Sequence, residues 1–468
     1  MNKKILVTLI ISVIIIGIFA SVACVFSALY LFRSTDQVET SDKAASPVPD
    51  LPTITEETQT DTGEKNTKTD IPPQIQVEME LIQRQVIEER GLESTGVFTR
   101  VLFTREQLKE RLVEDFREDY DPEEEKESAA VLDVFGLLNA DFDLYNFYLD
   151  LLTEQISGFY DNETKEMVVV LGEGFEGPQR LTYAHEYTHA LQDQNFDIQD
   201  GLNYNDDACE VDTERCAAIQ ALLEGDASLS ELGWYQENAT IEDQREILSF
   251  YSDLESPMLD SAPAFISEDL LFPYEAGYTF VDYLYQRGGW NAINAAYNSP
   301  PVSTEQILHP EKYPDDRPIE VPIPDLTPIL GDDWEEIDRN VMGEWYIYLI
   351  LAHGLSDKFR ISETIAEEAA AGWGGDTYVV YHNHQQDSTV MALRALWESP
   401  SQAEEFINAF LDYAQGRFGK PVEKTPEYYS WDLAGYKHTL FIEDVYTTWI
   451  SAPEQDIVTQ VWDIIQGQ

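Results

Sequence analysis

Two histidines that flank a glutamate form the most chemically specific stretch of this sequence. In the run TYAHEYTHALQ at 182–192, His185 and His189 stand four positions apart, and Glu186 directly follows the first of them. Residues four apart lie one turn apart on the same face of a helix, so both imidazoles can bind one Zn²⁺ ion. Glu186 points elsewhere, where it is suited to take a proton from an activated water and return it to a leaving amine. The pattern predicts a zinc hydrolase with Glu186 as the general base; two surface histidines on an amphipathic helix are the alternative.

A catalytic zinc site needs a third protein ligand and keeps one position open. The best candidate is Glu224, which follows the apolar run 221–223 and should therefore lie on a buried helix. The next residue, Gly225, would let that helix approach another element closely. Either Asp226 or Glu231 is a candidate for orienting a ligand histidine. The alternative is that Glu224 is an ordinary exposed helical glutamate.

A tetrahedral intermediate also needs a hydrogen-bond donor beside its oxyanion. The candidate is Tyr274, in the run PYEAG at 273–277, where a helix is expected to start. A packing role is the alternative for one of 25 tyrosines. Two further histidines, His382 and His384, alternate on an expected strand and face the same side, where they are either solvent-exposed or able to bind a stray metal.

With these residues, the chain resembles the gluzincin branch of zinc peptidases, the group of thermolysin and the membrane alanyl-aminopeptidases. The resemblance covers roughly residues 155–297. It implies a zincin-like fold, Zn²⁺ held by His185, His189 and Glu224, and Tyr274 as the transition-state tyrosine of a Pro-Tyr-Glu-x-Gly motif. The part expected outside the cell also resembles uncharacterised bacterial membrane proteins that carry the run HEYTHALQDQ.

Two departures limit what the resemblance implies. Thermolysin-like enzymes have an aspartate four residues after the ligand glutamate, and that position here is Ser228; the Gly-x-Met-Glu-Asn motif of the aminopeptidases is absent from the sequence. Endopeptidase action on peptide or protein substrates is therefore expected. Two alternatives stay open: a catalytically inactive zincin-fold protein that binds a surface component, and a zinc hydrolase of a non-peptide ester or amide bond.

The elements that position these residues follow from hydrophobic periodicity. Helices are expected over 75–89, 104–116, 122–138, 142–156, 177–194, 217–232 and 273–287, and a strand, turn and strand over 158–170. After a connection rich in Pro and Asp at 313–333, the pattern changes. Helices are expected there over 344–353, 361–371, 402–415 and 455–465, with strands over 377–382, 390–398 and 428–451. This alternation predicts a C-terminal α+β lobe.

The N-terminus predicts how the protein is anchored. An apolar run over 5–32 follows Lys3 and Lys4 and is long enough to cross a bilayer, with residues 1–4 in the cytoplasm and the C-terminal body outside. A lipoprotein processing site at Cys24 is the alternative. Residues 33–76 have the composition of a disordered stalk.

The expected fold class is therefore α+β, with an N-terminal transmembrane helix, a mainly helical zincin-like metallopeptidase domain over 77–335, and the α+β lobe over 336–468. Such a chain would be a single-pass protein of the cell membrane, whose only membrane contact is the N-terminal helix.

Charge and cysteine content restrict the partners. The chain has 88 Asp and Glu against 29 Lys and Arg, a formal net charge of -59. Such a surface repels phosphate backbones, which excludes nucleic acid as a partner, and leaves Ca²⁺ binding open. Among three cysteines, Cys209 and Cys216 are near enough in sequence to form a disulfide outside the cell, with free thiols as the alternative.

Overall fold

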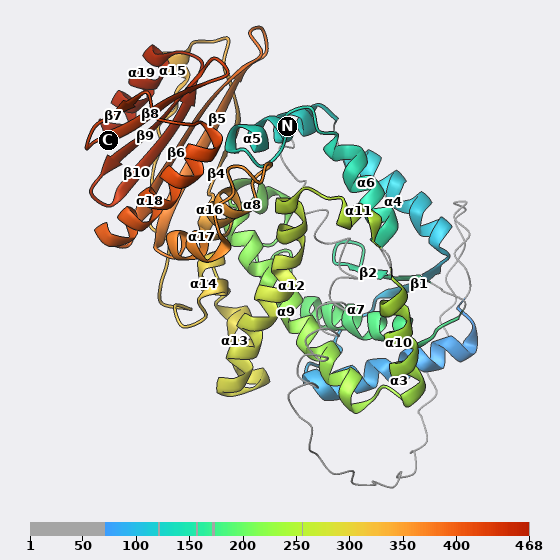
Figure 1. Ribbon diagram of the computed structural model, residues 1–468. Coiled ribbons are helices and arrows are strands. Elements are labelled where there is room, and N and C mark those ends of the chain that lie inside the picture. The colour runs from blue at the N-terminus through green and yellow to red at the C-terminus, as the bar shows by residue number, and fades with distance from the viewer. Residues whose placement is uncertain (1–70, 120–121, 156–157, 171–173, 255, 468) are drawn as a thin grey trace.

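The computed structural model of the protein describes residues 71–119, 122–155, 158–170, 174–254 and 256–467 (Figure 1). The expected anchor at 5–32 lies outside these ranges, as does the expected stalk up to residue 70. None of the helices within them combines the length and apolar character that crossing a bilayer requires. The most apolar of these helices, α16 (Gly343–Ala352), has 10 residues, whereas a span needs roughly 20. The fold class expected from the sequence is therefore wrong in including a transmembrane helix: the described chain is a mixed helix and sheet protein.

Four helices and a small sheet begin the described chain. The helices α3 (Pro73–Arg90), α4 (Arg105–Asp119), α5 (Pro122–Phe135) and α6 (Leu144–Gln155) lie where helices were expected. The strands are β1 (Thr99–Phe103), β2 (Gly158–Asp161) and β3 (Glu166–Val170). Their order is β1-β3-β2, with β1 parallel and β2 antiparallel to β3. The strand, turn and strand predicted over 158–170 is confirmed, and β1 was not predicted.

Three long helices, α7 (Gly177–Phe196), α9 (Thr213–Glu237) and α12 (Ala264–Gly288), cross near the centre of the molecule (Figure 1). α9 packs against both of the others and is buried on most sides, as suits a helix without a continuous polar face. α12 begins at Ala264, so the prediction that this helix starts near Pro273 is wrong. Its first turns bury Phe265 and Ile266, and Pro273 lies inside the helix.

Shorter helices surround this centre: α8 (Asp206–Val211), α10 (Ile241–Asp253), α11 (Pro257–Asp260), α13 (Trp290–Asn298), α14 (Thr304–Leu308) and α15 (Thr327–Leu330). A disulfide joins Cys209 of α8 to Cys216 of α9, which resolves the alternative left open by the sequence. The unpredicted α10 packs along α7.

The C-terminal part is an antiparallel sheet with helices on both faces. Its strand order is β4-β5-β6-β10-β9-β8-β7. The strands are β4 (Glu335–Asn340), β5 (Trp373–Asn383), β6 (Ser388–Trp397), β7 (Glu423–Lys424), β8 (Tyr428–Leu433), β9 (Tyr436–Glu443) and β10 (Tyr446–Ala452). One face packs against α16, α17 (Glu363–Ala370) and α18 (Pro400–Arg417), and the other against α19 (Gln455–Gln466). β4 was not predicted because its sequence, EEIDRN, is mostly charged and has a single β-branched residue.

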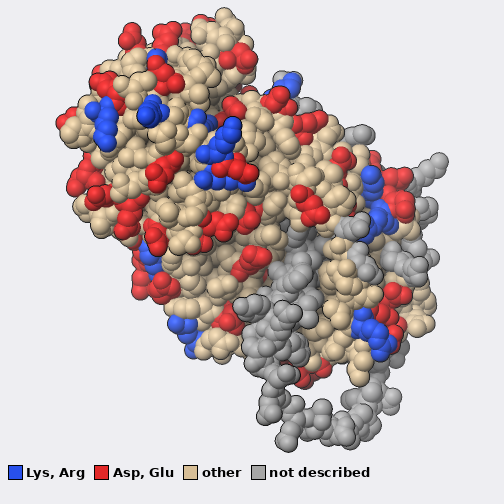
Figure 2. Space-filling view, in the orientation of Figure 1, with Lys and Arg blue, Asp and Glu red and all other residues tan. Residues whose placement is uncertain are grey.

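A shared apolar core joins the helices to this sheet. Phe135 at the end of α5 meets the rings of Tyr378 on β5 and Trp449 on β10 edge-on, at centroid distances of 5.3 and 5.9 Å. Arg417 of α18 donates hydrogen bonds to the backbone carbonyl of Val134 at 3.0 Å. The C-terminal sheet is thus packed onto the helical part. Figure 2 shows Asp and Glu side chains spread over both parts, with smaller groups of Lys and Arg.

Candidate functional site

The site begins with the start of α7, which fixes where the two histidines point. Pro178 lies in the first turn, where its missing N–H costs nothing, and the side-chain oxygen of Gln179 accepts a hydrogen bond from the Glu176 N–H at 3.1 Å. From this start, His185 and His189 fall on one face two and three turns into the helix. Both are buried, at 1% and 5% exposure.

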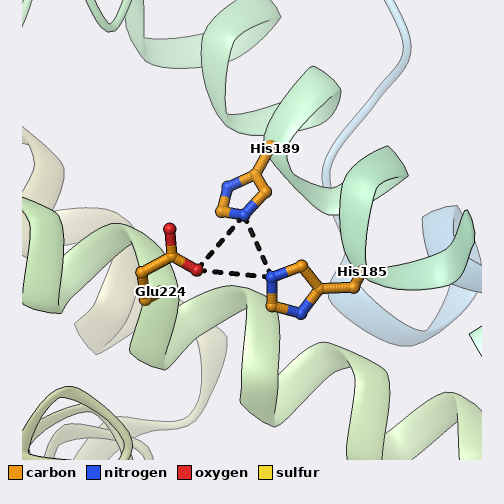
Figure 3. Close-up of side chains that lie close together, drawn as sticks. All are labelled: His185, His189 and Glu224. Atoms are coloured by element: carbon orange, nitrogen blue, oxygen red, sulfur yellow. Dashed lines mark hydrogen bonds and ion pairs between the residues drawn. The ribbon is translucent and has the colours of Figure 1, made fainter. Parts of the chain in front are cut away.

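The structure brings His185 and His189 together with Glu224 of α9 (Figure 3). The two Nε2 atoms lie 3.1 Å apart, and Oε2 of Glu224 lies 3.3 Å from Nε2 of His185 and 3.4 Å from Nε2 of His189. Ligand atoms bound at 2.0–2.1 Å around a tetrahedral zinc are roughly 3.3–3.4 Å apart. The triangle of donor atoms therefore has the size that a zinc ion requires.

The other nitrogen of each imidazole is held by a hydrogen-bond acceptor. Nδ1 of His185 lies 2.9 Å from Oε2 of Glu231, and Nδ1 of His189 lies 2.8 Å from Oε1 of Gln192. Gln192 is oriented unambiguously, because its amide nitrogen donates to the Leu223 carbonyl at 3.0 Å. Each Nδ1 is thus a donor, which leaves the Nε2 lone pairs for a metal. Of the two candidates for this orienting role, Glu231 contacts His185 directly.

The charges of the site call for a cation. Burial lowers the pKa of His185, but hydrogen bonds from Glu224 and Glu231 outweigh it and raise that pKa to about 10. For Glu224, burial acts to raise the pKa, while the two histidines hold it below its usual value. A proton shared among these groups therefore occupies, in the metal-free protein, the place that a metal ion would take.

Two glycines bring α9 close enough to α12 for Glu224 to be enclosed. A Cβ on Gly225 would lie 2.1 Å from the carbonyl oxygen of Gly277, and one on Gly277 would lie 2.2 Å from that of Ala221. Neither contact is possible for a larger residue. The prediction that Gly225 permits a close approach to another element is confirmed, and the element is α12.

Glu186 lies beside the triangle and is fully buried. Neither of its carboxylate oxygens has a side-chain hydrogen-bond partner within the described chain. Burial raises the pKa of Glu186 to about 7, while the charges of His185 and His189 and the backbone amide of Tyr160 act in the opposite direction. A carboxylate kept near neutral pKa is suited to accept and donate protons.

Two buried tyrosine hydroxyls also lie close to the carboxylates of the site. The hydroxyls of Tyr274 on α12 and Tyr204, just before α8, have no hydrogen-bond partner among the described residues. Burial, and then the charge of Glu224, raise the pKa of both hydroxyls. Both therefore remain protonated donors. Tyr274 was a candidate from the sequence, whereas Tyr204 was missed because nothing in its local sequence marks it.

A network that the sequence analysis missed supports His189 from behind. Asp226, the other candidate orienting group, accepts from Nε of Arg90 at 2.6 Å, from the Tyr297 hydroxyl at 2.6 Å and from the Gln192 amide at 2.9 Å. It therefore acts on His189 only through Gln192. Gln192 follows His189 by one helical turn, which was a readable signal; Arg90 lies 136 residues from Asp226, and no local pattern links them.

A second acidic group and the two strand histidines differ from this centre. Glu305, Asp316 and Glu398 lie close together, but the ammonium of Lys312 stands among them, 2.7 Å from Glu305 and 3.0 Å from Glu398, and supplies their cation. His382 and His384 stack at a centroid distance of 4.8 Å. Each lies near a separate carboxylate, Asp387 at 3.8 Å and Glu335 at 3.4 Å.

Comparison with known proteins identifies only the C-terminal part. A family described as a domain of unknown function (DUF8575) matches residues 330–462, which run from β4 into α19. The metal-binding triangle lies outside the matched residues. Neither a curated protein nor a solved structure matches the chain.

Proposed function

We propose that the protein is a zinc-dependent hydrolase that cleaves internal peptide bonds, with His185, His189 and Glu224 as metal ligands and Glu186 as general base. The observation that carries this proposal is the zinc-sized triangle of donor atoms whose imidazoles are fixed from behind, next to a buried carboxylate without a side-chain partner. The resemblance of the HEYTH run to gluzincins supports the same assignment. A scaffold that only bound a surface component would have no use for Glu186 in this position.

Zinc bound there would supply a Lewis acid that lowers the pKa of a water and polarises the scissile carbonyl. Glu186 takes the proton from the attacking water and delivers it to the leaving nitrogen. The hydroxyl of Tyr274 donates a hydrogen bond to the oxygen on which negative charge develops, and Tyr204 offers a second donor nearby. Because both hydroxyls are unpartnered before substrate binds, no protein hydrogen bond has to break for them to do so.

The test is cleavage of a library of peptides blocked at both ends, with the zinc content of each protein measured in parallel. Glu186→Gln should bind as much zinc as the wild type and lose activity by about 10²–10⁴-fold, the usual contribution of a general base. Glu275→Gln changes an exposed glutamate of α12 and is the matched control; it should cleave at the wild-type rate.

Three results would contradict the proposal in different ways. Undiminished cleavage by Glu186→Gln would remove the general base. Hydrolysis of esters or cell-wall amides, with peptides left intact, would move the activity to a non-peptide bond. A zinc-loaded wild type that cleaves nothing would leave a binding protein.

A further inference from the structure

A cavity of about 130 Å³ lies between the helical part and the C-terminal sheet, on the far side of Tyr274 from the metal-binding triangle. The ring of Tyr274 lines it, and so does Gln220, which precedes Glu224 by four residues on α9. Four residues of helix correspond to roughly 6 Å. The cavity therefore opens about one helical turn from the third metal ligand, within reach of a substrate residue next to the scissile bond.

The walls of the cavity are mostly apolar and come from both parts of the molecule. The helical part contributes Val131, Leu144, Phe265, Ile266, Leu270 and Phe272. The C-terminal part contributes Val341, Met342, Tyr346 and Tyr378, all within the residues matched by the domain of unknown function. That domain thus supplies one wall of a cavity whose other wall is α12, the helix that carries Tyr274.

Three carboxylates border the cavity, but neighbouring donors already engage them. Asp269 accepts from the Trp345 indole at 2.9 Å and from the Tyr346 hydroxyl at 2.7 Å. Glu214 accepts from the Thr304 hydroxyl at 2.8 Å. Asp338 accepts from the Tyr378 hydroxyl at 2.7 Å. Burial also raises the pKa of Asp269 and of Glu214. These acids therefore offer a lysine or arginine little uncompensated charge.

The size of the cavity fits one ring or one branched aliphatic chain. An apolar cavity of roughly 150 Å³ takes up benzene. We infer that this cavity is the specificity pocket of the enzyme, that it receives a phenylalanine or leucine side chain adjacent to the cleaved bond, and that the C-terminal domain takes part in selecting substrate. This inference rests on the proposed function for the identity of the ligand as part of a peptide.

The variant Leu270→Trp tests it, because Leu270 is a partly exposed side chain on the cavity wall. The matched control, Leu271→Trp, adds the same ring at the next position of α12, which is equally half-buried but does not line the cavity. In the blocked-peptide library, wild type and Leu271→Trp should prefer Phe or Leu over Ala or Lys at one position flanking the cut. Leu270→Trp should lose at least tenfold in kcat/KM for Phe and Leu peptides, with zinc content unchanged.

A binding measurement separates failure of the pocket from failure of the proposed function. N-acetyl-phenylalaninamide should bind wild type and Leu271→Trp in ligand-observed NMR, bind Leu270→Trp at least tenfold more weakly, and compete better than N-acetyl-lysinamide. If this pattern appears in a protein that cleaves no peptide, the pocket stands and the hydrolase does not. If peptides are cleaved without an apolar preference, or if Leu270→Trp behaves as Leu271→Trp in both assays, the specificity pocket is overturned while the hydrolase remains.

Discussion

Each of the two candidate ligand histidines depends on one neighbouring residue for the direction of its lone pair. Glu231 holds Nδ1 of His185, and Gln192 holds Nδ1 of His189. Groups that hold a ligand imidazole in this way typically account for a factor of 10–100 in metal affinity. The two α9 glutamates therefore have different roles: Glu224 is a candidate ligand, and Glu231 orients a ligand.

Glu231→Ala tests this division of roles. Removing the carboxylate frees the His185 ring to rotate and its Nδ1 to lose its acceptor, so zinc affinity should fall about 10–100-fold. Glu237→Ala, at the exposed end of the same helix, should leave affinity unchanged. Competition with a zinc-binding dye measures both. Equal affinities for the two variants would show that Glu231 has no orienting role.

At the scale of helices, the centre depends on how closely α9 and α12 approach each other. The backbones touch at Gly225 and Gly277, which places Glu224 and Tyr274 beside the same histidines. Glu224 and its glycine could be read from the sequence because they follow a buried apolar run. The start of α12 could not, because Pro273 looks like a first-turn proline when the buried residues ahead of it are not known to pack.

Gly225→Ala should separate these two helices. The added methyl group overlaps the Gly277 carbonyl, so stability should fall by about 1–3 kcal/mol, and zinc affinity should fall with it. Gly233→Ala, two turns later on α9, meets only the flexible side chain of Glu89 and serves as the control, since alanine favours a helix over glycine. Urea unfolding and zinc titration measure the two effects. A destabilisation no larger than that of Gly233→Ala would contradict the close approach.

A buried histidine at the junction of α18 and β9 predicts acid sensitivity. His438 stacks on Phe418 at 4.2 Å, its Nδ1 is buried without a partner in the described chain, and burial together with the charge of Arg417 lowers its pKa to about 3, against an opposing effect of Asp432. The unfolded chain, with an ordinary histidine pKa near 6.5, binds the proton first. The stability that neutral His438 allows is therefore present above about pH 6.5 and is lost as the pH falls towards 3.

His438→Phe keeps the ring stacking and cannot be protonated. Between pH 7 and pH 4 the wild type should lose about 3 kcal/mol of unfolding free energy more than this variant. The exposed His384→Phe should follow the wild type. Denaturant unfolding at several pH values measures the difference. Parallel curves for wild type and His438→Phe would show that His438 titrates normally in the folded protein.

At the scale of the whole molecule, local sequence carried the centre further than it carried the architecture. The spacing of His185 and His189 needs only a helix, and Glu224 needs only the next long helix, so the convergence could be predicted. The support by Arg90, the donor Tyr204 and the wall formed by Tyr378 could not, because they come from segments far apart in the chain that only the packed core brings together.

The anchor shows a different limit. An apolar run predicts a membrane span from composition alone, but the described helices are held by packing against one another, and none of them has the character of a span. Packing of Phe135 against Tyr378 and Trp449 also means that a part matched as a separate family shares its core with the helices that carry the metal-binding triangle.

X-ray absorption at the zinc edge of the zinc-loaded protein tests the central claim most directly. The account predicts one zinc per chain with two imidazole nitrogens and a carboxylate oxygen at roughly 2.0–2.2 Å, a spectrum that Glu237→Ala preserves and that Glu224→Ala changes by loss of the carboxylate. A spectrum without imidazole scattering, or one that is the same in Glu224→Ala and Glu237→Ala, would contradict it.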